Sequence, residues 1–235
     1  RDREHGANIH ALNSVDVDAF QAALYGKRYE NLQLIHDLGH SVQKYGGRAF
    51  RNVITDQNYE VLDFFINNGV DINYNKPDSV YPFNPTPLCV AARYVDLQMC
   101  QYLVEHGADV TITEKDGMRP YSIAIEKGDM EMAEYFKNLE PAEYHDKQNK
   151  MDQLKPFKLP KVLISFLEGD NLYFELPDSD FISIEFLPLL DTVPFKWGRR
   201  KLLRLSKELG EYNDYQIVWD LSLIHISEPT RLGMI

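Results

Sequence analysis

The side chains best suited to nucleophilic or redox chemistry are the two cysteines, Cys89 and Cys100. Two thiols without a neighbouring cluster of Cys and His provide neither a disulfide framework nor a zinc site. Neither lies beside an obvious general base, which would help a catalytic thiol to form its thiolate. We therefore expect both cysteines to be reduced and buried rather than catalytic.

Histidine is the other common metal ligand, and the chain has seven. None of them forms a recognisable metal-binding spacing. His36 and His40 are four residues apart, but Gly39 between them is typical of a helix end, so a shared ligand face is not expected. We predict neither a metal site nor a cofactor for His5, His10, His36, His40, His106, His145 and His225.

Carboxylates in the C-terminal part could act as a general acid and base. Glu168 and Asp170 are two residues apart in a predicted polar turn, and Glu175 and Asp178 follow. A solvated role is the default in such a turn, and the chain lacks the G-x-S-x-G, Walker, G-x-G-x-x-G and H-E-x-x-H motifs. We therefore expect a non-catalytic protein, with an enzyme that uses these carboxylates as an alternative.

Basic side chains gather at one place only, between residues 196 and 207. The segment 201–209 has a helical spacing of leucines, so Arg200, Arg204 and Lys207 would share one helix face. Such a face could meet an acidic partner or a phosphate backbone. Glu208 and Glu211 lie close by and an aromatic stacking pattern is missing, which favours a solvated face instead.

Composition and charge limit the class of protein. The chain has 235 residues, of which 44% are hydrophobic and 12% aromatic, enough to build a real core. Its net charge of −11 disfavours general binding to nucleic acid or to an anionic membrane. The longest apolar runs fall short of the roughly 20 residues that cross a bilayer, and residues 1–12 lack a signal-peptide pattern. We expect a cytoplasmic protein.

Four segments of the chain share one pattern. The clearest reads T-P-L-C-V-A-A-R-Y at 86–94, followed by C-Q-Y-L-V-E-H-G-A-D-V at 100–110. This resembles the ankyrin repeat. Weaker copies align positions 22, 53 and 124 with position 91, and positions 91 and 124 are one ankyrin period of 33 residues apart. The longer interval before position 91 holds an insertion, 74–84, whose two prolines predict a loop at a hairpin tip.

The repeat pattern has a physical basis. A Thr-Pro pair starts a helix, because Thr caps it and Pro gives up an amide that has no acceptor in the first turn. Gly69 and Gly107 are predicted to end the second helix of their repeats in the left-handed conformation. One repeat cannot bury its apolar face alone, so neighbours must stack. We predict a mainly α protein, an ankyrin-repeat solenoid of stacked helix pairs over residues 10–140 with a small α+β C-terminal module.

The resemblance implies that hairpin tips and the concave helix face bind another protein, whose identity the sequence does not reveal. Tyr and Arg are enriched at interface hot spots, so Tyr25, Arg93 and Tyr94 are the preferred anchors. The acidic net charge favours a basic or mixed protein partner over nucleic acid or membrane. The full predicted set of partner-binding residues is Tyr25, Asp56, Phe83, Arg93, Tyr94, Lys115, Met118, Glu126 and Lys127.

The chain after the repeats is predicted to contain a linker, 141–158, and a small α+β module, 159–220. The expected elements are a helix at 159–167, a hairpin of strands 171–176 and 181–186, a helix at 201–209 and a strand at 215–219. The opening L-P-x-x-L-x-x-F-L at 159–167 is faintly similar to SUKH-type proteins, although Gly169-Asp170-Asn171 stands where that family has Asn-Gly. This resemblance implies a bacterial toxin-immunity protein as an alternative function.

The last residues are treated separately. The segment L-S-L-I-H-I-S-E-P-T-R at 221–231 looks like a translated sequencing adapter, and 232–235 fit its continuation. We exclude 221–235 from functional reasoning, as is usual for a vector-derived scar. The C-terminal module would then be truncated.

Overall fold

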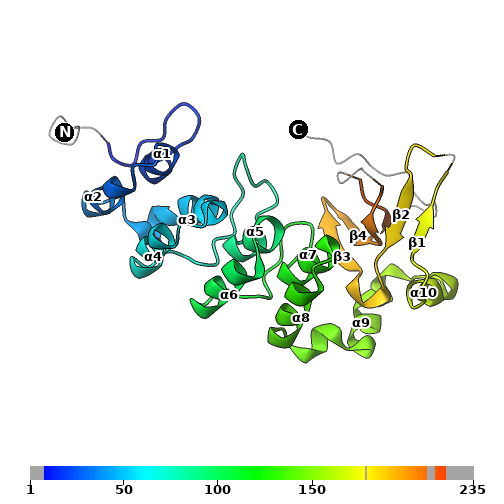
Figure 1. The fold of residues 1–235 in the computed structure, drawn as a ribbon. Coiled ribbons are helices and arrows are strands. Elements are labelled where there is room, and N and C mark those ends of the chain that lie inside the picture. Colours follow the sequence, from blue (N-terminus) through cyan, green and yellow to red (C-terminus); the bar gives the residue numbers. More distant parts are fainter. Residues whose placement is uncertain (1–7, 178, 211–214, 221–235) are drawn as a thin grey trace. The chain divides into compact units, whose positions relative to one another are not determined.

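A computed structural model describes residues 8–177, 179–210 and 215–220. The chain divides into two compact units, 1–112 and 113–235. The adapter-like segment 221–235 lies outside the described residues, as does Asp178. Figure 1 traces the elements of both units along the chain.

The described part of the first unit consists of three helix pairs. Helix α3 packs against both α1 and α5, so successive pairs stack within this unit. Figure 1 shows the two helices of the second and third pairs side by side. The helices are α1 (Ala19–Tyr25), α2 (Leu32–Asp37), α3 (Val42–Val53), α4 (Tyr59–Asn67), α5 (Pro87–Tyr94) and α6 (Leu97–Glu105), with 3₁₀ turns η2 (Tyr29–Asn31) and η3 (Ile54–Asp56).

The local signals for these helices act as predicted. The Thr86 hydroxyl accepts a hydrogen bond from the Cys89 backbone N–H at 3.1 Å, and Pro87 is the first residue of α5. Gly69 and Gly107 end their helices at φ +77° and +97°, in the left-handed region that favours glycine. The boundaries of the repeats are therefore encoded locally.

The described second unit begins with one more helix pair and continues into helices and two small sheets. Both sheets are antiparallel, with strand orders β1-β2-β5 and β3-β4-β6. The helices are α7 (Pro120–Lys127), α8 (Met130–Leu139), α9 (Lys147–Leu154) and α10 (Lys161–Leu167), with 3₁₀ turns η4 (Ala142–His145), η5 (Lys155–Phe157) and η6 (Leu189–Asp191). The strands are β1 (Tyr173–Glu175), β2 (Ser183–Phe186), β3 (Val193–Trp197), β4 (Arg200–Arg204), β5 (Ser206–Glu208) and β6 (Val218–Asp220).

The start of α7 departs from the repeat pattern. Arg119 occupies the place of the capping Thr and makes no side-chain cap. Its guanidinium instead makes a two-pronged ion pair with Glu140, with Nε 2.6 Å from Oε1 and Nη2 3.0 Å from Oε2. Glu140 also lies 2.8 Å from His145 Nε2. This partly buried network joins both ends of the last helix pair to the segment expected to be a linker, which contains η4, α9 and η5.

One predicted element is wrong. Residues 201–209, expected to form a helix, lie in strands β4 and β5. Strand β4 pairs along its whole length with β3, and Leu203 and Leu205 are both buried in the core of this unit. Strand pairing with residues distant in the sequence overrides the local leucine spacing here. The predicted hairpin is present as β1 and β2, with Phe174 opposite Ile184.

The core of the second unit brings together parts distant in the sequence. Lys150 on α9 is buried and its ammonium donates a hydrogen bond to the carbonyl of Thr192. The Tyr121 hydroxyl on α7 lies 2.9 Å from the Asp191 carboxylate. The apolar centre consists of Leu154, Phe157, Leu167, Leu189, Leu203 and Leu205.

Candidate functional site

The insertion at 74–84 is held to α3 by a buried arginine. The Arg51 side chain is fully buried, and its Nη1 donates to the carbonyls of Lys76 at 2.7 Å and Pro85 at 3.1 Å. Its Nη2 pairs with the Asp78 carboxylate. Arginine suits this position because its planar fork offers several donors in fixed directions.

Two tyrosines of the insertion enclose the same guanidinium. The Arg51 guanidinium carbon lies 5.0 Å from the Tyr74 ring centroid and 4.9 Å from that of Tyr81, within cation–π range. Adding a Cβ to Gly47 on α3 would place it 2.3 Å from the Tyr74 ring, so glycine makes room for that ring. The insertion is therefore packed against α3.

Asp78 is the second anchor of the insertion. Its Oδ1 accepts hydrogen bonds from the backbone N–H groups of Val80 at 2.8 Å and Tyr81 at 2.7 Å, and Arg48 Nε lies 3.3 Å from Oδ2. Burial would raise the pKa of the Asp78 carboxyl, but the Tyr81 hydrogen bond and the Arg51 charge outweigh it and lower the pKa. The charged form is the one the fold stabilises.

Tyr25 and Tyr94 of the first unit both lie within electrostatic range of Tyr81 in the insertion. Burial raises the pKa of the Tyr81 hydroxyl, and Tyr94 and Tyr25 lie close enough to raise it further through their own hydroxyls. Tyr25 and Tyr94 are each 61% exposed, whereas Tyr81 is partly covered. We call Tyr25, Tyr81 and Tyr94 the tyrosine surface.

The other residues predicted for the first unit lie in different surroundings. Asp56 is exposed on η3, while Phe83 in the insertion and Arg93 at the end of α5 are half-buried. Sequence reasoning selected Tyr25 and Tyr94 but missed Tyr81. A usable signal was present in the sequence, because the insertion carries Tyr74, Tyr81 and Asp78 opposite a helix that contributes two arginines.

The predicted residues of the second unit include one correction. Met118 is only 2% exposed, and Arg204 Nη1 lies 3.4 Å from its sulfur, so this side chain contributes to packing and is not a surface contact. Glu126 is half-buried and pairs with the same Arg204. Lys115 and Lys127 are exposed, and their role in partner binding stays a prediction.

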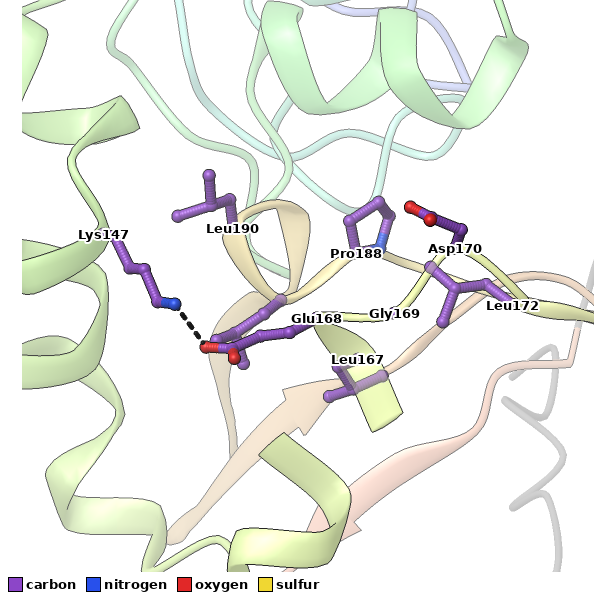
Figure 2. Close-up of a pocket in the computed structure, with 9 residues that line it drawn as sticks. Lys147, Leu167, Glu168, Gly169, Asp170, Leu172, Pro188 and Leu190 are labelled. Carbon is purple, nitrogen blue, oxygen red and sulfur yellow. Dashed lines mark ion pairs between the residues drawn. The ribbon is translucent and has the colours of Figure 1, made fainter. Parts of the chain in front are cut away.

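The second unit also contains an open pocket of about 460 Å³ (Figure 2). Lys147 at the start of α9 and Glu168 after α10 face each other there, with Nζ 2.9 Å from Oε1. Both are solvent-accessible, so this ion pair adds little to stability. Asp170 lies at the other end of the lining, away from the ion pair. Two of the predicted carboxylates thus line one pocket, whereas Glu175 lies in β1 and is not among its lining residues.

The described residues lack two features that would indicate other functions. No group of three or more His, Cys, Asp or Glu among them could hold a metal ion. None of the described helices is both long and apolar enough to cross a bilayer.

Comparison with known proteins identifies the repeats. A family model described as ankyrin repeats, in three copies, matches residues 49–148. The RelA-associated inhibitor of Mus musculus is 41% identical over 85 residues, which are 36% of this chain and 9% of that protein. Ankyrin repeats are confirmed over residues 49–148, whereas the first predicted copy lies outside the matched residues. The mainly α fold with a small α+β C-terminal module is also confirmed.

A second comparison corrects the expectation of a non-catalytic protein. The chain is 25% identical over 170 residues to the palmitoyltransferase AKR1 of Lachancea kluyveri. The match covers 72% of this chain and 22% of that protein. Because an enzyme is among the relatives, absence of catalysis does not follow from the repeats. The chain spans less than a quarter of the length of either relative.

Proposed function

Because residues 49–148 are ankyrin repeats, we propose that this chain binds another protein through the tyrosine surface of its first unit. The observation that carries the proposal is the grouping of Tyr25, Tyr81 and Tyr94, two of them largely exposed. Tyrosine supplies a large contact area and a polar hydroxyl, and it is enriched among the residues that dominate binding energy.

The packing beneath the tyrosine surface supports the proposal. Tyr81 stacks on the Arg51 guanidinium, which is itself tied to Asp78 and to two backbone carbonyls. A surface whose side chains are already held in place loses less conformational entropy on binding than a mobile loop would. The net charge of −11 favours a basic or mixed protein partner. We propose that binding takes place in the cytoplasm.

A comparative affinity capture tests this function. The full chain and a Tyr25→Ala/Tyr94→Ala variant would be used as baits in a lysate of the source cells, followed by quantitative mass spectrometry. Each hot-spot truncation is worth about 2 kcal/mol, so we expect at least a tenfold loss of the captured partners. Loss of the same partners on Arg93→Glu would extend the site to that residue.

A matched variant controls for loss of exposed tyrosine in general. Tyr144→Ala/Tyr173→Ala removes two exposed tyrosines from the second unit and should leave capture unchanged. Thermal unfolding must show that both variants remain folded. Recovery of identical partners at equal yield by the wild type and the Tyr25→Ala/Tyr94→Ala variant would contradict the proposal.

This binding role is compatible with catalysis elsewhere in a longer protein. One relative is named as a palmitoyltransferase, and in such a protein the repeat surface would select the partner presented to the enzymatic part. The toxin-immunity function implied by the SUKH resemblance remains an alternative prediction. It would be distinguished by capture of a secreted toxin through the second unit, independent of the tyrosine surface.

A further inference from the structure

The basic cluster predicted for a helix lies mostly on a β-hairpin tip in the second unit. In the pairing of β3 with β4, Val193 lies opposite Arg204 at one end and Trp197 lies opposite Arg200 at the other. This leaves a two-residue loop of Gly198 and Arg199. Gly198 has φ +59°, and glycine at the first loop position suits such a tight turn. Residues 196–201 are all exposed.

Cations occupy both faces of this hairpin tip. Residues directly opposite each other in an antiparallel pair project from the same face. Lys196 opposes Lys201 on one face, and Trp197 opposes Arg200 on the other. We call residues 196–201 the basic tip. Like charges placed directly opposite destabilise a strand pair, so the Lys196–Lys201 pair is a local cost that folding alone does not explain.

Only part of the positive charge of the basic tip is paired with carboxylates of the described residues. Arg200 Nη1 lies 3.3 Å from the Asp220 carboxylate. Lys196, Arg199 and Lys201 make no ion pair with any described residue. The two basic residues further along are engaged: Arg204 is buried against Glu126, and Lys207 pairs with Glu185. Within the basic cluster 196–207, the exposed cations are thus those of the tip.

An exposed tryptophan lies among these cations. Trp197 is 45% exposed, and the Lys115 ammonium lies 5.7 Å from its ring centroid. Tryptophan is favoured at the boundary between lipid headgroups and acyl chains, where its ring is half in a polar and half in an apolar environment. Lysine and arginine beside it would contact the negatively charged headgroups.

We propose that the basic tip binds the surface of an anionic lipid bilayer. Cations lie on both faces of the hairpin and in its loop, so all of them could contact a flat surface that the tip approaches end-on. A groove in a protein would instead engage one face of the hairpin. A single exposed indole is not the series of stacking platforms that single-stranded nucleic acid uses. The acidic net charge of the whole chain led us to expect no binding to an anionic membrane. The basic tip is locally positive, and the proposal differs from that expectation for this reason.

Vesicle co-sedimentation of the full chain tests the proposal. The probes are phosphatidylcholine vesicles with and without about 30% phosphatidylserine, at about 0.1 M and about 0.5 M salt. We expect binding only to the serine-containing vesicles, and release at high salt. Lys196→Gln/Lys201→Gln should lower the partition coefficient about 10- to 30-fold, and Arg199→Gln about fivefold.

Controls separate the tip from net charge and from misfolding. Lys137→Gln/Lys161→Gln removes the same charge from exposed positions of the second unit and should leave vesicle binding unchanged. Wild-type tryptophan fluorescence should be quenched by brominated lipid. Trp197→Phe should abolish this quenching, because the other tryptophan, Trp219, donates its indole N–H to the Phe157 carbonyl and stays in the fold.

Several outcomes would overturn the proposal. These are no binding to serine-containing vesicles at low salt, equal loss in the tip and control variants, and quenching that survives Trp197→Phe. Tip-dependent binding to polyuridylate without vesicle binding would assign the tip to nucleic acid instead. Tip-dependent binding to an acidic peptide alone would assign it to a protein.

Discussion

At the scale of single residues, Arg51 is the side chain whose environment is most demanding. A fully buried guanidinium needs partners for its charge and its donors, and Asp78 with two carbonyls supplies them at Nη1 and Nη2, whereas Nε has no hydrogen-bond partner among the described residues. Breaking a buried pair from one side leaves an unpaired charge in the protein. The insertion and its tyrosines therefore depend on this one residue.

We expect Arg51→Met to destabilise the first unit by about 3–5 kcal/mol, because it removes the nearer of the two arginines that pair with the buried Asp78 carboxylate. Arg28→Met is the matched control. Arg28 is exposed and its nearest carboxylate oxygen, on Glu30, is 3.9 Å away, so its loss should cost about 0–1 kcal/mol. Urea unfolding measures both, and equal midpoints for the two variants would refute the role of Arg51.

The pKa of Asp78 predicts how stability depends on acid. Its folded pKa lies below the unfolded value of about 3.9, so the carboxylate's contribution is complete above that pH and is lost as the pH falls through the folded pKa. Asp78→Asn should remove this part of the acid sensitivity and lower stability at neutral pH. Denaturant unfolding from about pH 7 to about pH 3 measures it. Parallel pH profiles for the variant and the wild type would argue against it.

At the scale of elements, the insertion packs closely against α3 because Gly47 of that helix has no side chain. Because a Cβ at position 47 would collide with the Tyr74 ring, Gly47→Ala should displace the insertion and cost about 1–3 kcal/mol. In a Tyr74→Ala background the obstacle is gone, and the same substitution should be neutral or stabilising, since alanine favours helix. A double-mutant cycle of unfolding free energies measures this coupling, and additivity would exclude the contact.

Helix α6 contributes Leu103 to the repeat core, where it is fully buried. We expect Leu103→Ala to cost about 2–5 kcal/mol through the cavity that it leaves. Leu34→Ala on α2 is the control, because Leu34 is largely exposed and should change stability by no more than about 0.5 kcal/mol. Chemical unfolding compares the two, and similar losses would indicate that Leu103 is not a core residue.

At the scale of the whole molecule, each unit buries charge that links its distant segments. In the second unit, burial and then the Arg119 charge lower the pKa of Lys150, Asp191 partly opposes them, and the resulting pKa is about 8. Between the folded pKa and the unfolded value of about 10.4 the unfolded chain holds more protons. Stability should therefore rise as the pH increases through this range.

Lys150→Met tests that linkage while keeping most of the side-chain volume. Methionine cannot titrate, so the variant should lack the alkaline rise in the stability of the second unit. Unfolding free energies between about pH 7 and about pH 10.5 measure it, with exposed Lys161→Met as the control. A rise that persists unchanged in Lys150→Met would show that another group is responsible.

The sequence alone determined the repeats, because their signals are local. Thr86 and Pro87 start a helix through contacts within its first turn, and Gly69 and Gly107 end helices through their own backbone freedom. Tyr25 and Tyr94 were selected because each position follows from the repeat. None of these features depends on which distant segment packs nearby.

Tertiary structure alone decided the features that join distant segments. Tyr81 came beside Tyr25 and Tyr94 only through packing of the insertion on Arg51, and Met118 was buried by Arg204, 86 residues further along. The leucine spacing of 201–209 suggested a helix, yet the segment forms strands that pair with β3 and with β2. Pairing energy comes from partners that a local pattern does not specify, so the second unit could not be predicted in the same way.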